Sequence, residues 1–277
     1  MDLINSYQRL PSHIDPVAFR VGAFAVTWYS LAYLAAFTVV YLLLIYRIKK
    51  KEGDFSREEI SDFLLYAIIG LLIGARFGYV LFYDPLYFWH SPISVIWPFD
   101  ASGNYTGIRG MSYFGGLTGI VLASLIFVRK YKTNFWKLAD FVVPAIPAGY
   151  FFGRLGNFLN GELYGRVTTK PWGMYFSDGL LRHPSQLYEA FFEGLVLFAI
   201  LWVNRGNRKF SGQLLPLYLF GYGFYRFFIE FFREPDPQLG LFFGLLTLNQ
   251  LFSILAMSVA ATAFFYFGRK GAKIVNS

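Results

Sequence analysis

Cysteine is absent from the 277-residue chain, and histidine occurs only three times, as His13, His90 and His183. The missing cysteines exclude disulfides, thiolate metal sites and a cysteine nucleophile. The histidines are scattered and form no metal-ligand pair. The sequence also contains no Gly-x-Ser-x-Gly elbow, no HExxH and no P-loop, so hydrolase and nucleotide-binding functions lack support.

Apolar residues dominate what is present. The chain is 56% hydrophobic and 21% aromatic, and only 15% of its residues are charged. Crossing a hydrocarbon core takes about 20 apolar residues as a helix. We therefore predict an all-α polytopic membrane protein, a single integral membrane domain over residues 1–277. It has seven transmembrane helices, at about 21–46, 60–83, 112–128, 138–158, 187–204, 212–232 and 246–267.

The basic residues indicate the orientation of these helices. The net charge is +8, but the lysines and arginines lie in short loops between spans, which is typical of membrane topology and not of nucleic-acid binding. The loops 47–57, 129–137 and 205–209 with the C-terminal tail hold fifteen of them, against six on the opposite side. We therefore predict an external N-terminus, a cytoplasmic C-terminus, and external loops at 84–111 and 159–186.

A polar motif ends the predicted fourth span. Residues 153–165 read Gly-Arg-Leu-Gly-Asn-Phe-Leu-Asn-Gly-Glu-Leu-Tyr-Gly. Arg154 and Asn157 are three residues apart and share a helical face, and Asn160 and Glu162 follow where the helix emerges. Such groups are costly in a bilayer unless they face protein, water or a polar ligand.

A second polar stripe lies on the predicted sixth span, which runs in the same direction. Tyr222, Arg226, Glu230 and Arg233 recur on one face of an otherwise apolar helix. One interpretation is a self-neutralising Arg226–Glu230 pair that fixes helix packing. The other is a pocket, shared with Arg154, that binds an anion, because the planar guanidinium binds phosphate bidentately and stays charged.

Three further features admit a structural interpretation. Gly70, Gly74 and Gly78 form a small-residue face for tight helix packing, and Arg76 among them has either a structural partner or a functional one. Tyr29 reads first as an interfacial aromatic residue and second as a pocket residue. Residues 183–189, which open the fifth span, include Gln186 and Glu189 as candidates for helix capping.

The motif of residues 153–165 resembles the signature of bacterial prolipoprotein diacylglyceryl transferases. The resemblance extends over nearly the whole chain. It includes Trp28-Tyr29, Gly74-Ala75-Arg76, Gly110-Met111-Ser112, Gly115-Gly116-Leu117, Asp140, residues 183–189, and Arg226 through Arg233 to Pro235.

This resemblance implies an enzyme of the bacterial inner membrane that acts on its outer side. Such an enzyme transfers diacylglycerol from phosphatidylglycerol to the thiol of the lipobox cysteine beside a prolipoprotein signal peptide, and glycerol-1-phosphate is released. Membrane lipids and the prolipoprotein are then its partners, and neither a metal nor a cofactor is needed. The expected catalytic residues are Arg154, Arg226 and Glu230, and the expected lipid-binding residues are Arg154, Asn157, Asn160, Glu162, Arg233, Tyr29 and Tyr222.

One position departs from the family pattern. The best-known members have His-Gly-Gly where this chain has Phe114-Gly115-Gly116. Phenylalanine cannot accept the thiol proton, so either no base is needed there or another group serves. Two rival functions share the intramembrane arginines: a transporter or flippase for an anionic lipid, and a lipid-binding scaffold without activity. A transporter predicts internally repeated helix sets around a midplane site, and the sequence has no convincing repeat.

Overall fold

The computed structural model describes residues 3–22, 24–83, 85–97, 110–235, 242 and 244–275. The chain forms two compact units, one of residues 1–53 with 139–277 and one of residues 54–138. The described residues are mostly helical. Five helices are long and apolar enough to cross a membrane: Trp28–Lys49, Arg57–Phe82, Tyr113–Lys130, Ser185–Asn204 and Leu248–Lys270. This confirms a polytopic helical membrane protein, while the count of seven spans and the orientation stay predictions.

The first membrane-spanning helix does not extend back into the N-terminal segment, which has its own short elements. Short helices α1 (Leu3–Gln8) and α2 (Leu10–His13) precede an antiparallel hairpin of β1 (Val17–Val21) and β2 (Phe24–Thr27). Helix α3 (Trp28–Lys49) begins only after it, with the Thr27 side chain accepting a hydrogen bond from the Ser30 N–H. The predicted start of this span at residue 21 is therefore wrong. Gly22 turns the hairpin at a positive φ of 60°, and the Thr27 cap fixes where the helix begins.

The second unit is built on two closely packed helices, α4 (Arg57–Phe82) and α6 (Tyr113–Lys130). A Cβ atom at Gly74 would lie 2.4 Å from the Gly115 carbonyl oxygen, and one at Gly119 would lie 1.9 Å from that of Gly70. The predicted small-residue face is thus confirmed as a tight helix contact. Short helices α5 (Pro85–His90) and η1 (Pro92–Val95) follow α4. In the predicted external loop 84–111, residues 84 and 98–109 lie outside the described residues.

Arg76 on α4 has a structural partner, one of the two alternatives that the sequence leaves open. Its guanidinium donates to three backbone carbonyls, at 2.7 Å to Ser94, 2.6 Å to Val95 and 3.1 Å to Gly110. It also stacks on the Phe88 ring, with the guanidinium carbon 5.0 Å from the ring centroid. Arg76 therefore holds the segment after α4 against its helix.

The predicted fourth span is broken in the structure. It consists of α7 (Phe135–Val142), a 3₁₀ turn η2 (Val143–Ala145) and α8 (Ile146–Leu159). Pro144 and Pro147 lie at the two junctions, where each removes a backbone donor from the helix. The predicted fifth span is α9 (Ser185–Glu189), a π-helical segment η3 (Ala190–Val196) and α10 (Leu197–Asn204). The predicted sixth span is α11 (Leu214–Ile229), and the last is α12 (Leu248–Val275).

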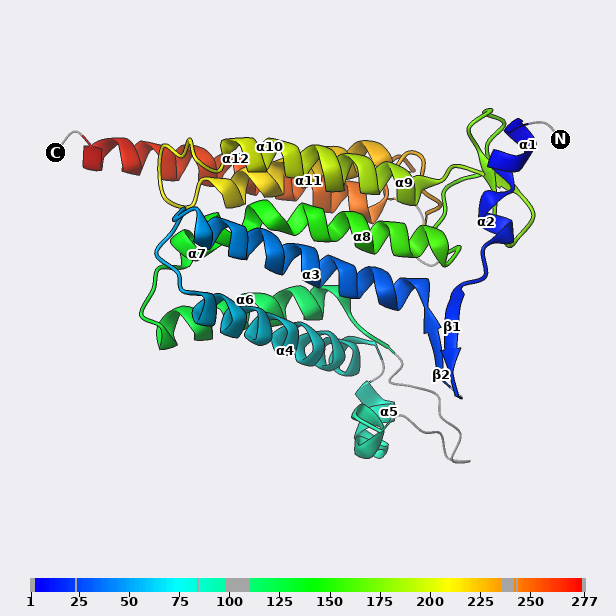
Figure 1. Cartoon of the computed structure of the whole chain (residues 1–277), viewed down its shortest axis with the longest axis horizontal. Helices are drawn as coiled ribbons and strands as arrows, with labels where there is room; N and C mark the ends of the chain where they lie inside the picture. Colours follow the sequence, from blue (N-terminus) through cyan, green and yellow to red (C-terminus); the bar gives the residue numbers. More distant parts are fainter. Residues whose placement is uncertain are drawn as a thin grey trace. The chain divides into compact units, whose positions relative to one another are not determined.

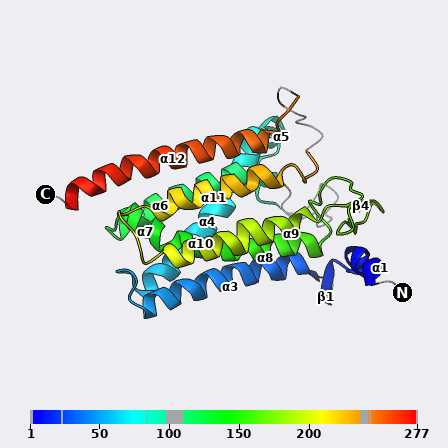
Figure 2. The ribbon, with the colours of Figure 1, turned by 90° about the horizontal axis from the view of Figure 1, so that it is seen from above.

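The helices of the first unit lie side by side. Figure 2 shows α3, α8, α10, α11 and α12 in succession, and contacts join α3 to α8, α8 to η3, α10 to α11 and α11 to α12. Close approach depends on glycine. A Cβ at Gly156 would lie 2.8 Å from the Ala32 Cβ, and one at Gly194 would lie 2.8 Å from the Phe151 Cβ. Both positions bring a neighbouring helix near Arg154.

The segment between α8 and α9 is folded onto the end of α11. Strands β3 (Met174–Tyr175) and β4 (Leu181–Arg182) pair, and Gly165 bridges to Arg233. Figure 1 shows this segment as green loops beside α1 and α2, both of which contact β3. Phe158, Met174 and Phe176 form a small buried core beneath. The segment thus covers the end of the helices at which Arg154 and Arg233 lie.

A group of charged residues lies at the other end of α3, and we name Arg47, Glu52, Asp140 and Arg205 the loop cluster. Arg47 is fully buried and donates to the carbonyls of Asp140 and Phe141 at 3.0 and 2.5 Å. Its Nε contacts Glu52 at 2.9 Å, and Glu52 also pairs with Arg205. Asp140 accepts from the N–H groups of Gly212 and Leu214. The loop cluster therefore fixes backbone turns.

Candidate functional site

Three arginines from two regions of the first unit meet around one carboxylate. Arg154 lies on α8, Arg226 lies on α11, and Arg233 follows the end of α11. Their side chains keep 18%, 10% and 13% of their surface exposed. Each is therefore mostly covered by protein, yet each has an accessible part that a ligand can contact.

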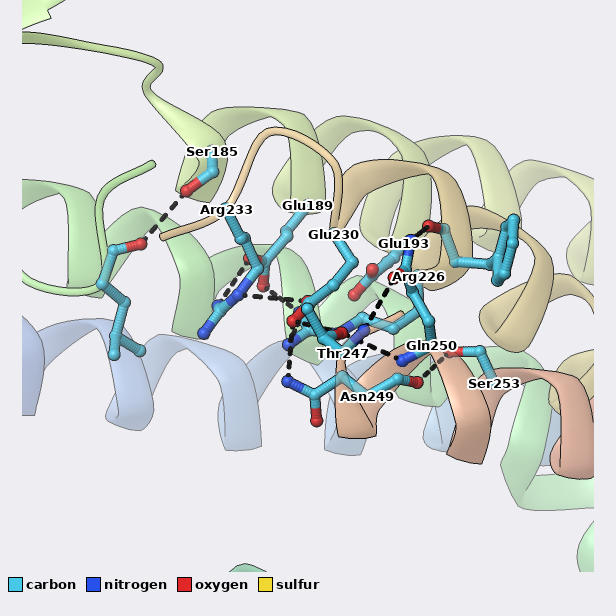
Figure 3. A network of polar contacts seen from close by, with 12 residues as sticks. Ser185, Glu189, Glu193, Arg226, Glu230, Arg233, Thr247, Asn249, Gln250 and Ser253 are labelled. Atoms are coloured by element: carbon cyan, nitrogen blue, oxygen red, sulfur yellow. Dashed lines mark hydrogen bonds and ion pairs between the residues drawn. The ribbon is translucent and has the colours of Figure 1, made fainter. Parts of the chain in front are cut away.

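Glu189 on α9 is the centre of this arrangement (Figure 3). Its side chain is completely buried. Oε2 lies 2.7 Å from Arg154 Nε and 3.1 Å from Arg226 Nη1, and Oε1 accepts from Arg233 Nη1 at 2.9 Å. A single buried carboxylate thus holds three like charges together, which offsets their mutual repulsion.

Glu230 is a second buried carboxylate in the same place. Its Oε2 lies 3.3 Å from Arg226 Nη2 and 3.4 Å from Arg233 Nε. Its Oε1 accepts from the Thr247 hydroxyl at 3.1 Å and from Asn249 Nδ2 at 3.0 Å (Figure 3). We name Arg154, Glu189, Arg226, Glu230 and Arg233 the Glu189 cluster.

The structure therefore joins the two motifs that the sequence treats separately. The Arg226–Glu230 pair exists, as the structural interpretation predicts, but it does not close on itself. Both residues are shared with Glu189 and Arg233, and Arg154 Nη1 donates to the Asn157 side-chain oxygen at 3.2 Å. The pair is part of a larger cluster that includes the arginine of α8.

Tyr150 and Glu193 extend the cluster along α8 and η3. Arg154 Nε donates to the Tyr150 hydroxyl at 2.8 Å. That hydroxyl donates to Glu193 Oε2 and lies 3.2 Å from Glu189 Oε2. The Tyr150 ring packs edge-on against the Tyr222 ring, with centroids 5.9 Å apart. Tyr222 thus lies beside the cluster, as the stripe on the sixth span predicts.

Asn160, Glu162 and Tyr29 lie at the edge of the site. Asn160 Nδ2 donates to Glu162 Oε1 at 2.7 Å. The Tyr29 hydroxyl donates to that of Tyr33 at 3.1 Å. No hydrogen bond or ion pair within the described part of the chain joins these three residues to an arginine of the cluster. Gly156 of α8, however, packs on Tyr29.

The capping roles predicted at the start of the fifth span are wrong. Helix α9 has Pro184 at its N-cap, with no side-chain cap. Gln186 instead donates to the Glu162 carbonyl at 2.6 Å, and Glu189 binds the arginines. Sequence reasoning therefore missed Glu189, and it also missed Tyr150, Glu193, Thr247 and Asn249. Glu189 and Glu193 carried a usable signal, because two carboxylates four residues apart inside an apolar span need partners.

His183 precedes α9, and its ring contacts Tyr188 and Phe232. The Nδ1 atom lies 3.1 Å from the Tyr188 hydroxyl, and the ring centroid lies 5.2 Å from that of Phe232. Burial lowers the pKa of His183 below its ordinary value, and the charge of Lys170 lowers it further. His183 is therefore neutral at neutral pH and acts as a hydrogen-bonding partner of Tyr188.

The chemistry of the site favours a phosphate ligand. Among the described residues, no group of three or more histidine, aspartate or glutamate side chains is placed to hold a metal ion. Arg154 Nη2 has no protein partner in the same residues, and 18% of the surface of the Arg154 side chain is exposed. Guanidinium groups bind phosphate oxygens through short, charge-assisted hydrogen bonds. The site can thus hold a phosphate and stabilise charge that develops on it.

Known proteins of similar sequence share one description. Residues 16–266 match the family model described as prolipoprotein diacylglyceryl transferase. A phosphatidylglycerol–prolipoprotein diacylglyceryl transferase of Chlorobaculum tepidum is 48% identical over 264 residues, covering 93% of this chain and 91% of the relative. Proteins of the same name from Wolinella succinogenes and Bordetella avium are each 46% identical. They cover 90% and 87% of this chain and 92% and 89% of their own lengths.

Proposed function

Since this chain belongs to the prolipoprotein diacylglyceryl transferase family, we propose that it transfers the diacylglyceryl group of phosphatidylglycerol to a prolipoprotein. The acceptor is the thiol of the lipobox cysteine, and glycerol-1-phosphate is released. The convergence of Arg154, Arg226 and Arg233 on Glu189 is the observation that supports this activity, because it builds a cationic site for the phosphate inside an apolar protein.

During the reaction, negative charge develops on the leaving phosphate. The sulfur attacks the glycerol carbon that carries the phosphate ester, the carbon–oxygen bond breaks, and its electron pair remains on the phosphate. Arg154 and Arg226 clamp that phosphate and stabilise its growing charge. Glu230 and Arg233 complete the network that orients them. Such preorganised donors commonly contribute about 10²–10³-fold each to the rate.

The remaining predicted residues surround the head group. Asn157 is bonded to Arg154 and orients it. Asn160, Glu162 and Tyr29 lie where the glycerol of the head group extends from the phosphate, and Tyr222 lines the side beside Tyr150. Their amide, carboxylate and hydroxyl groups suit the hydroxyls of glycerol.

The proposed setting is the bacterial inner membrane, with seven spans, an external N-terminus and a cytoplasmic C-terminus. The five long apolar helices account for five spans; α7–η2–α8 and α11 supply the other two. The excess of basic residues in the loops beside Arg47, Arg129 and Arg205 supports this orientation. It puts the Glu189 cluster in the outer half of the membrane.

One assay separates this function from a transporter and from a passive lipid-binding scaffold. Purified protein is incubated with phosphatidylglycerol labelled in its head group and with a peptide that contains a lipobox cysteine. A transferase yields lipidated peptide and an equal amount of labelled glycerol phosphate. A peptide with serine in place of the cysteine is the matched control and yields neither product. Binding of the lipid without either product would contradict the proposal.

A further inference from the structure

A thiol must lose its proton before or while it attacks, and the described residues of the Glu189 cluster differ in their capacity to accept one. Glu189 forms ion pairs with three arginines. Glu230 forms ion pairs with two arginines and accepts hydrogen bonds from Thr247 and Asn249. The donors around these two carboxylates occupy the directions from which a further proton would arrive.

Glu193 is the buried carboxylate of this region that forms no ion pair with the three arginines among the described residues. Only 1% of the residue is exposed, and its Oε1 has no hydrogen-bond partner in the described part of the chain. Its Oε2 accepts from the Tyr150 hydroxyl, and no arginine of that part lies within ion-pair distance of it. Buried polar atoms are normally paired, so a carboxylate oxygen left without a donor calls for an explanation, and acceptance of a proton supplies one.

Tyr150 connects this carboxylate to the phosphate clamp. A phenolic oxygen carries one hydrogen and two lone pairs. The hydrogen is donated to Glu193, and one lone pair accepts from Arg154 Nε at 2.8 Å. The second lone pair remains for an incoming proton. Because Nε and the Nη groups belong to one rigid guanidinium, a phosphate held by Arg154 Nη2 lies on the same group that contacts Tyr150.

We propose that Tyr150 and Glu193 together accept the proton of the substrate thiol, an assignment that rests on the proposed transferase function. The S–H proton passes to the Tyr150 oxygen as the hydrogen of Tyr150 passes to Glu193 Oε2. The sulfur pair forms the bond to the glycerol carbon, and the bond from that carbon to the phosphate oxygen breaks, leaving its electrons on the phosphate. The proton then returns through Tyr150 to the departing glycerol phosphate.

The surroundings of Glu193 suit this relay. The charged and titratable groups that face it are Tyr150 and Arg154 from α8, Arg226 from α11, and Glu189 on its own helix. The positive charge of Arg154 stabilises any transient charge on the Tyr150 oxygen, to which it is hydrogen-bonded. Gly194, packed on Phe151, brings this part of η3 close to α8. Phe114, in contrast, offers no group that can take a proton.

The test compares two nucleophiles on the same variants. Glu193→Gln and Tyr150→Phe are assayed with a lipobox peptide that contains cysteine and with one that contains selenocysteine, whose selenol is already ionised at neutral pH. With the thiol peptide we expect a rate loss of about 10²–10⁴-fold, the usual contribution of a general base. With the selenol peptide both variants keep nearly the wild-type rate, because no base is needed.

A pH series gives a second readout. The rate of Glu193→Gln with the thiol peptide rises towards the ordinary pKa of a thiol, about 8.5, as solvent supplies the thiolate. A purely structural role would lower the rates with both peptides equally at every pH and would overturn the assignment, as would an unchanged rate with the thiol. The matched controls are two exposed residues away from the site, Tyr46→Phe near the end of α3 and Glu58→Gln in the first turn of α4.

Failure of the assignment is distinguishable from failure of the proposed function. If the wild-type protein lipidates neither peptide, the transferase function itself fails. If the wild type lipidates both and the variants show no selective loss with the thiol, only the role of Tyr150 and Glu193 is overturned. Where Glu193→Gln does not insert in the membrane, Tyr150→Phe keeps the test intact, because it removes one oxygen and leaves the buried charges in place.

Discussion

The Glu189 cluster and the loop cluster both gather arginines and carboxylates in the first unit, but their partners differ. In the loop cluster, Arg47 donates to two backbone carbonyls and Asp140 accepts from two backbone N–H groups. In the Glu189 cluster, the arginines contact side chains, and 10–18% of the surface of each arginine side chain stays exposed. A buried arginine is therefore no functional marker by itself; the atoms that its guanidinium binds decide its role.

The largest effect that we expect is a loss of transfer activity when an arginine of the Glu189 cluster is replaced. Arg154→Ala and Arg226→Ala each remove a phosphate clamp, so we expect transfer to fall by about 10²–10³-fold in each variant. The proteins still insert in the membrane. Lysine at either position restores only part of the rate, because it lacks the planar fork. Initial rates of peptide lipidation at equal amounts of monodisperse protein measure the effect, and near-normal transfer by Arg226→Ala would contradict the clamp.

Arg47→Ala in the loop cluster should have the opposite effect: it should lower stability and leave activity unchanged. Removing this fully buried side chain leaves two carbonyls without their donor and leaves Glu52 paired with Arg205 alone. Each buried acceptor left unsatisfied costs about 1–3 kcal/mol of stability. We expect a much lower unfolding temperature in detergent, with the activity of each folded molecule retained. A stable but inactive variant would show that the loop cluster takes part in the reaction.

The two central carboxylates allow a closer comparison. Glu189→Gln keeps the shape of the side chain but turns an amide donor towards the arginines, which displaces at least one of them. Misplacement by about 1 Å can cost about 10²-fold in rate. Asp140→Asn instead removes an acceptor from one of two backbone N–H groups and lowers stability by about 1–3 kcal/mol. Parallel measurement of kcat and of unfolding temperature for both variants checks this division.

The smallest effect that we expect is a loss of stability at acidic pH, through Glu52 of the loop cluster. Burial by itself raises the pKa of Glu52, but the hydrogen bonds from Arg205 and Arg47 outweigh it, so the pKa lies below its ordinary value. The stabilisation is thus complete above the unfolded pKa of about 4.3 and is lost as pH falls through the folded value. Unfolding temperatures of wild type and Glu52→Gln should differ at pH 7 and converge in this acidic range. A constant difference would exclude the linkage.

Much of the fold follows from simple patterns in the sequence. Apolar runs of the right length predict α3, α4, α6 and α12, and the spacing of Gly70, Gly74 and Gly78 predicts the contact of α4 with α6. The break in the fourth span does not follow from the hydropathy of the sequence. Its prolines at 144 and 147 lie in an apolar run that hydropathy alone reads as continuous. The hairpin before Trp28 was also missed, because its residues are as apolar as those of the helix that follows.

The candidate site shows where single-sequence reasoning ends. The spacing of Arg154 with Asn157, and of Arg226 with Glu230 and Arg233, predicts which side chains share a helical face. It does not reveal which faces of separate helices meet. The sequence alone therefore offers Glu189 as a candidate for helix capping, whereas the structure puts it between three arginines. Tyr150 was overlooked for the same reason, since a tyrosine in an aromatic-rich span gives no sign of its partner.

The central claim is that the phosphate of phosphatidylglycerol is held between Arg154 and Arg226. An experimental structure with an unreactive phosphonate analogue of this lipid tests it most directly. We predict phosphonate oxygens at about 2.7–2.9 Å from the guanidinium nitrogens of both arginines, with the glycerol of the head group towards Asn160 and Tyr29. A head group bound elsewhere, with neither guanidinium in contact with the phosphonate, would contradict it.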